Sequence, residues 1–214
     1  MGIRPMLCAV ALLVAFHASA AEPLEVYLPQ ADAYTDHDVA AFAMQAPPPG
    51  GNAAYRHQLD LVVRRDPRNV IALAERAYIS GKLGDLERAR ADLAAAASIA
   101  SPGSIEEGHV FWSRGWIEYQ AGNYPASLAA FKGEIASHGG RPFWVPSTLA
   151  TLYWSAGDIE TAVAWYAASV RSYPELGTED GMEKRIGFWR PSEKQAMRGA
   201  FAEWKRRQTG AATP

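Results

Sequence analysis

The turn Lys82-Leu83-Gly84-Asp85 decides the fold, because a turn of the same kind occurs twice more along the chain. Its counterparts are Gln120-Ala121-Gly122-Asn123 and Ser155-Ala156-Gly157-Asp158. The central glycines lie 38 and 35 residues apart, and the longer interval contains a Ser101-Pro102-Gly103 loop. A turn that recurs at a spacing of roughly 34 residues is typical of repeat proteins, in which each repeat contributes one unit of supersecondary structure.

Small and bulky residues recur at fixed distances from these three glycines. A small residue stands seven positions before and five positions after each glycine, and a bulky apolar residue stands nine positions after it. In the three segments these positions hold Ala77, Ala89 and Leu93; Gly115, Ser127 and Phe131; and Ala150, Ala162 and Tyr166. Helix axes approach closely only where side chains are small. The pattern therefore predicts helix pairs, and no segment shows the two-residue alternation of a strand.

These residues resemble the tetratricopeptide-repeat (TPR) family over residues 52–176, with repeats at about 70–103, 108–141 and 143–176. The resemblance implies an all-α solenoid of antiparallel helix pairs. Ser127 replaces the alanine that is usual in the family, and Pro146 opens the third repeat where an aromatic residue is common. The second repeat also lacks a closing proline. These departures blur single repeat boundaries and leave the array recognisable.

The segments on either side of the array do not follow the repeat. Residues 21–51 are expected to form an extended leader to about Gln30, a degenerate helix capped at Thr35, and a proline-rich turn. Residues 177–208 are expected to cap the array, with Ser192 and Gln195 as a capping box. Met197, Phe201 and Trp204 would form the apolar side of that last helix, and Phe111, Phe131, Leu149, Tyr153 and Tyr166 are expected in the core. Residues 209–214 are predicted to be disordered.

The first twenty residues have the layout of a secretory signal peptide. Arg4 precedes an apolar run from Met6 to Phe16, and Ala18-Ser19-Ala20 is a small-x-small cleavage site. The apolar run is shorter than the roughly 18 residues of a membrane-spanning helix. Residues 1–20 are therefore expected to be removed on export, which leaves no membrane span and a periplasmic or secreted protein.

Composition narrows the classes of function. The net charge of −2 among 214 residues gives no sign of the basic surface that nucleic acid selects. The single cysteine, Cys8, lies within the signal peptide, so the mature chain would have no disulfide and no thiol chemistry. No cofactor is expected.

Motifs of catalysis are missing from the sequence. It contains no Gly-x-Ser-x-Gly, His-Glu-x-x-His, Walker or Gly-x-Gly-x-x-Gly motif. Asp36-His37-Asp38 is the one local cluster of possible metal ligands, and it is more simply the charged first turn of a helix. The sequence therefore predicts a protein that is not an enzyme and holds no metal. An enzyme that acts on cell-wall sugar is a third alternative, although the inward positions contain no paired acids.

The tryptophans point to a binding surface. In the TPR family the first helix of each pair lines the concave side, and the resemblance assigns inward positions at thirteen, ten, six and three residues before each glycine. Aromatic side chains gather there, three or four residues apart on one helix face. The predicted binding residues are Tyr78, His109, Trp112, Trp116, Tyr119, Trp144 and Trp154.

Two readings of this aromatic stripe stay open. In the first, an apolar or proline-rich peptide of a cell-envelope protein binds in the groove, and the protein is a scaffold or adaptor. In the second, the segment from Gly177 to Trp189 folds back into the groove, and the protein is a structural module that self-associates through its last helix. The carboxylate clamp of chaperone-binding TPR domains is disfavoured, because most of the inward positions hold tryptophan, tyrosine or small residues and Lys82 alone is not a clamp.

Overall fold

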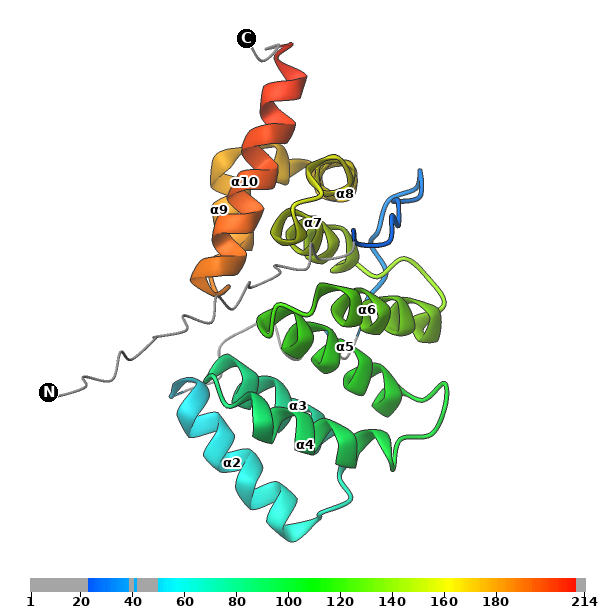
Figure 1. The fold of residues 1–214 in the computed structure, drawn as a ribbon, viewed down its shortest axis with the longest axis vertical. Coiled ribbons are helices and arrows are strands. Elements are labelled where there is room, and N and C mark those ends of the chain that lie inside the picture. The colour runs from blue at the N-terminus through cyan, green and yellow to red at the C-terminus, as the bar shows by residue number, and fades with distance from the viewer. Residues whose placement is uncertain (1–22, 39–40, 42–49, 211–214) are drawn as a thin grey trace, which may run out of the picture.

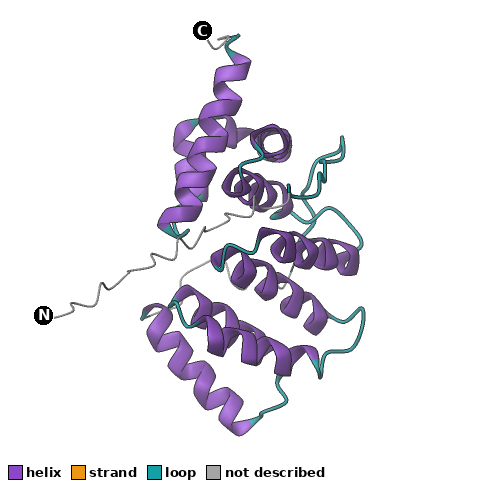
Figure 2. Cartoon of the chain, viewed as in Figure 1, coloured by secondary structure: helices purple, strands orange, loops and turns teal. Residues whose placement is uncertain are grey.

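The structure is a computed structural model that describes residues 23–38, 41 and 50–210. Within these residues the chain forms helices joined by loops, with no strand, so the predicted all-α class is confirmed (Figure 2). The α-helices are α2 (Gly51–Arg65), α3 (Val70–Lys82), α4 (Leu86–Ala97), α5 (Ile105–Gln120), α6 (Tyr124–His138), α7 (Val145–Ala156), α8 (Ile159–Ser172), α9 (Glu179–Arg185) and α10 (Pro191–Gln208). A 3₁₀ turn, η1 (Pro174–Gly177), joins α8 to α9.

The helices pack mainly against their neighbours in the chain. The closest partners are α3 with α4, α5 with α6 and α7 with α8, and α3 also packs against α2 and α5. Figure 1 shows α2 to α8 following one another along the long axis, with α9 and α10 at the far end. The helix α10 lies against α7 and α8. No helix among the described residues is both long and apolar enough to cross a bilayer.

The three recurring glycines end the first helix of each close pair. Gly84, Gly122 and Gly157 have φ angles of 87°, 74° and 86°, a left-handed conformation that glycine adopts without steric penalty. The next residue is the N-cap of the second helix, and in two of the three turns the side chain of an aspartate caps it. The Asp85 and Asp158 side chains accept hydrogen bonds from the backbone N–H groups two residues into the first helical turn.

Close crossings occur where the sequence places small residues. Gly115 on α5 lies under the Phe131 ring of α6, and a Cβ atom at Gly115 would stand 2.3 Å from that ring. Ser127 donates a hydrogen bond to the Gly115 carbonyl over 2.8 Å. The predicted core residues Phe131, Leu149, Tyr153 and Tyr166 are fully buried, whereas Phe111 is half-buried against Gly133.

Residues 23–38 form an extended N-terminal strap along the later helices (Figure 1). The Tyr27 backbone donates to the Tyr153 hydroxyl over 2.9 Å and accepts from the Trp165 indole over 2.6 Å. Asp36 and Pro142 form an isolated parallel bridge. Residues 23–30, the described part of the predicted leader, contain no helix and no strand.

The strap ends differently from the prediction. Residues 35–38 are not helical, and the Ala41 backbone donates to the Asp38 carboxylate over 3.1 Å. Asp38, and not Thr35, therefore supplies the capping group, because the Asp36 backbone is already paired with the chain at Arg141 and Phe143. Most of the predicted helix and proline-rich turn lies outside the described residues, as do the predicted signal peptide and residues 211–214.

The last helix also begins in a different register. Pro191 is its first residue, and the Arg190 backbone donates to Glu193 over 2.9 Å, so Ser192 is not the cap. Proline lacks an N–H group and fits the first helical position, which moves the cap from Ser192 to Arg190. The predicted apolar side is confirmed: Tyr166 contacts the rings of Phe201 and Trp204 at 5.8 and 5.6 Å between centroids.

Candidate binding pocket

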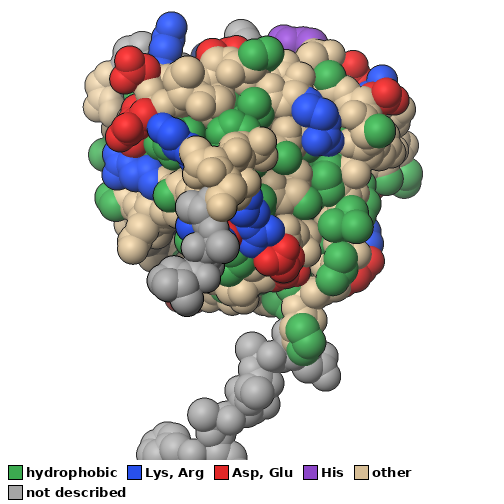
Figure 3. All heavy atoms as spheres, turned by 90° about the horizontal axis from the view of Figure 1, so that it is seen from above, with side chains coloured by type: hydrophobic (Ala, Val, Ile, Leu, Met, Phe, Trp, Pro, Cys, Tyr) green, Lys and Arg blue, Asp and Glu red, His purple; other side chains and the backbone are tan. Residues whose placement is uncertain are grey.

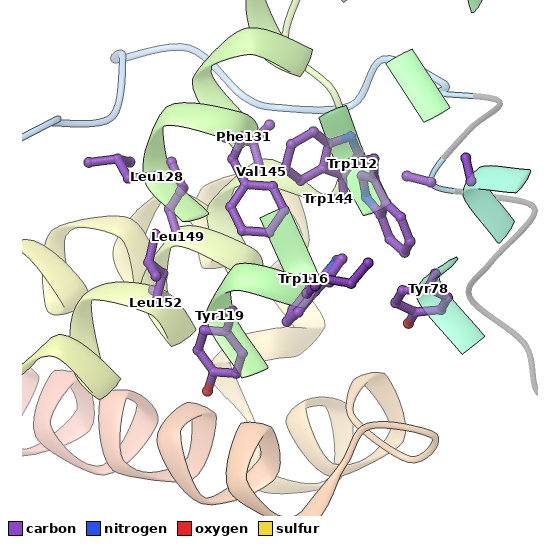
Figure 4. Close-up of a cluster of buried hydrophobic side chains, with 14 of the residues drawn as sticks. Tyr78, Trp112, Trp116, Tyr119, Leu128, Phe131, Trp144, Val145, Leu149 and Leu152 are labelled. Atoms are coloured by element: carbon purple, nitrogen blue, oxygen red, sulfur yellow. The ribbon is translucent and has the colours of Figure 1, made fainter. Parts of the chain in front are cut away.

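Four aromatic rings form a continuous row across α3 and α5. Ring centroids lie 4.9 Å apart from Tyr78 to Trp112, 6.1 Å from Trp112 to Trp116, and 5.6 Å from Trp116 to Tyr119. Figure 4 shows these side chains in succession, with Trp144 beside Trp112. The row exists because three- and four-residue spacings place side chains on one helix face.

The chain after α8 covers part of this row. Trp189, in the loop before α10, contacts Trp116 with 6.1 Å between ring centroids. A cavity of about 490 Å³ remains between the aromatic row and the segment from Tyr173 to Glu193. The cavity is lined by Tyr78, Lys82, Trp112, Trp116, Trp144, Thr148, Tyr173, Glu175, Leu176, Gly181, Lys184, Arg185, Phe188, Trp189 and Glu193. This volume is within the range of small-ligand sites.

The pocket brings together four of the seven predicted binding residues, namely Tyr78, Trp112, Trp116 and Trp144. All four side chains are largely buried, so they present ring edges and parts of faces to the cavity. Phe188 lies at the opposite wall and is 64% exposed. An exposed phenylalanine next to a partly covered aromatic wall is an apolar contact available to a ligand.

The other three predicted residues do not line the pocket. Tyr119 shares a hydrogen bond with Ser155 over 2.9 Å. Trp154 packs against α10, where a Cβ atom at Gly199 would stand 2.3 Å from its ring. His109 is buried near the carboxylate of Asp38.

Cations from two parts of the chain line the pocket. The Lys82 ammonium lies 5.1 Å from the centre of the Tyr78 ring. The Arg185 guanidinium lies 5.5 Å from the Phe143 ring and 5.6 Å from the Tyr173 ring. Lys184 is exposed at the edge. Sequence reasoning missed Lys184 and Arg185, because the repeat register that assigned inward positions ends before them.

Two acids also line the pocket. Glu193 is buried, accepts the hydrogen bond from the Arg190 backbone, and has its pKa raised by burial. Its charge raises the pKa of Tyr78 further, beyond the effect of burial, and offsets part of the fall that burial causes in the pKa of Lys82. Glu175 is exposed. The acids therefore belong to the C-terminal wall and not to the aromatic row.

A buried polar cluster lies beside the pocket, beneath the strap. The Trp144 indole donates to Asp38 over 2.6 Å, and the carboxyl group of Glu134 on α6 is buried close to Asp38. Burial, followed by Asp38 and then Glu107, raises the pKa of Glu134 to about 8. Burial lowers the pKa of His109, which is therefore neutral at pH 7. The cluster joins the strap to α5, to α6 and to Trp144 at the start of α7 through Asp38.

We also searched the described residues for metal ligands and the surface for patches of one charge. The part of the chain that the structure describes holds no group of three His, Cys, Asp or Glu side chains placed to bind a metal ion. On the face seen in Figure 3, basic, acidic and hydrophobic side chains are interspersed, and neither charge gathers into one large patch.

Comparisons with protein-family models, with curated proteins and with solved structures found no match for this chain. The resemblance to the TPR family therefore rests on the spacing of its turns and of its small and bulky residues.

Proposed function

We propose that this protein is an exported, non-enzymatic adaptor of the cell envelope, built as a TPR-like solenoid of antiparallel helix pairs. The regular glycine turns, the close crossings at small residues and the packing of successive helices support the solenoid. The signal-peptide layout of residues 1–20 supports export to the periplasm or the medium.

The observation that carries the function is the aromatic pocket. A cavity of about 490 Å³ has Tyr78, Trp112 and Trp116 on one side and the exposed Phe188 on the other. Aromatic side chains at a concave site are typical anchors for a partner's apolar residue. We assign this site to one or two apolar residues of an extended peptide segment, because the cavity is too small for a helix.

Binding explains the site better than catalysis does. The two acids of the pocket lie on the C-terminal wall, where Glu193 already caps a helix and Glu175 faces solvent. Within the described residues no nucleophile is paired with a base at the pocket. The side chains proposed for self-association, Phe201 and Trp204, pack inside the chain against Tyr166.

The test first selects, from a displayed random library, peptides that bind the purified protein. Synthetic copies of the selected peptides are then titrated into the wild type and two variants. Phe188→Ala removes an exposed ring of the pocket, and Ile105→Ala removes a similarly exposed side chain elsewhere, at 64% and 62% exposure respectively. We expect Phe188→Ala to weaken peptide binding about tenfold, or about 1.4 kcal/mol, with Ile105→Ala unchanged. Peptides that bind both variants as tightly as the wild type would remove the pocket from the proposal.

A further inference from the structure

The charges around the pocket do not balance. Lys82, Lys184 and Arg185 face two acids, Glu175 and Glu193. Burial raises the pKa of Glu193, which disfavours its ionised form. The pocket lining therefore holds more cations than acids, with Lys82 on α3 and the other two cations on the C-terminal wall.

Arg185 is the cation best placed to receive an anion. Its side chain lies in the pocket lining within cation–π range of Phe143 and Tyr173, and burial lowers its pKa. Within the described residues it forms no hydrogen bond and no ion pair. By contrast, Arg198 on the neighbouring helix α10 donates two hydrogen bonds to Glu183. The guanidinium of Arg185 is thus held by rings while its N–H donors lack an acceptor in the chain.

The chemistry of a guanidinium favours a carboxylate in this position. Its planar, forked donors match two carboxylate oxygens, whereas lysine offers a point charge. A partly desolvated pocket strengthens such a pair relative to one in water. The rest of the wall is aromatic, so the body attached to the carboxylate would be apolar or aromatic.

Resting on the proposed binding function, we infer that the pocket takes an organic carboxylate with an apolar or aromatic body, and that Arg185 binds the carboxylate. The body packs between Trp116 and Phe188, and Lys82 and Lys184 add positive charge at the edge. Two sources share this chemistry: a free small molecule, and the C-terminal end of a peptide chain.

Isothermal titration of the full chain with matched pairs tests the inference. The small-molecule pair is 3-phenylpropionate and 3-phenylpropionamide, and the peptide pair is N-acetyl-Gly-Gly-Phe as free acid and as amide. We expect each acid to bind at least tenfold more tightly than its amide. If the two acids bind equally, a free small-molecule carboxylate is sufficient as the ligand. If the peptide acid binds more tightly, the ligand is the C-terminal end of a peptide chain.

Variants locate the carboxylate. Arg185→Gln should remove the preference for acid over amide while leaving the affinity for the amide unchanged. Arg185→Lys keeps the positive charge and loses the paired N–H donors of the guanidinium, so it should retain a smaller preference for acid over amide. Arg198→Gln serves as the matched control outside the pocket and should bind as the wild type does. Circular dichroism of each variant verifies the fold.

Three results would overturn the inference, and only the third would also remove the proposed function. If acid and amide bind the wild type equally and Phe188→Ala weakens both, the pocket binds apolar groups and Arg185 has no role in recognition. If Arg185→Gln keeps the full preference for the acid, the carboxylate binds elsewhere. If none of the four ligands binds at millimolar concentration and no displayed peptide is selected, the proposed function fails as well.

Discussion

The carboxyl group of Glu134 should make the protein less stable as the pH rises. Its pKa is raised from 4.5 to about 8 in the folded chain, so the folded state holds a proton that the unfolded chain has released. The free energy of unfolding therefore falls as the pH rises from about 4.5 through about 8. At about 1.4 kcal/mol per pKa unit, a window from pH 6 to pH 9 covers roughly two units, or about 3 kcal/mol.

Replacement by glutamine isolates this effect. Glu134→Gln keeps the shape of the side chain and supplies an amide donor to Asp38 at every pH. Urea unfolding followed by circular dichroism should show wild-type stability falling by about 3 kcal/mol between pH 6 and pH 9, and a profile for the variant that lacks this fall. At pH 9 the variant should be the more stable protein.

Neighbouring groups define the controls. His109 has a lowered pKa, so it removes stability only as the pH falls below about 6.5, outside most of the window. Glu183→Gln should follow the wild type, because Arg198 lowers the pKa of Glu183 and keeps that carboxylate ionised throughout. Parallel profiles for the wild type and Glu134→Gln would refute a raised pKa of Glu134 beneath the strap.

Two further predictions concern packing and charge in the array. Gly115→Ala should destabilise the chain by about 1 to 3 kcal/mol in urea unfolding, since its Cβ would stand 2.3 Å from the Phe131 ring, and adding Phe131→Leu should recover most of the loss. Arg76→Ala should cost about 3 kcal/mol, because Arg76 donates two hydrogen bonds at 2.8 and 2.6 Å to the buried Asp92. Arg90→Ala, which breaks an exposed ion pair, should cost less than about 1 kcal/mol, and equal losses for the two arginines would contradict this account.

Within residues 52–176, the spacing of glycines and small residues was enough to predict where turns and close helix crossings lie. The turn at Gly157 requires a left-handed residue, and the crossing at Gly115 requires the absence of a side chain, so each glycine has one structural explanation. Helical spacing predicts Trp112 and Trp116 on one face of α5, and the repeat register adds Tyr78 on α3; the three rings do lie together.

Beyond the array, contacts between residues far apart in the chain decide the structure, and periodicity carries no information about them. Trp154 occupies an inward position in the repeat, yet α10 covers it at Gly199. Arg185 follows no repeat, so no spacing assigns it to the pocket. His109 belongs to a cluster that exists only because the strap brings Asp38 to it.

The strap also sets an order of events during synthesis. The groups that hold Tyr27 and Tyr34, namely Tyr153, Trp165 and Ser172, are made more than a hundred residues after the strap itself. Contacts so distant in sequence form after local helix pairs, since closing a long loop is slow. The strap is thus among the last parts of the chain to find its place, and its contacts are complete only when the end of α8 has been made.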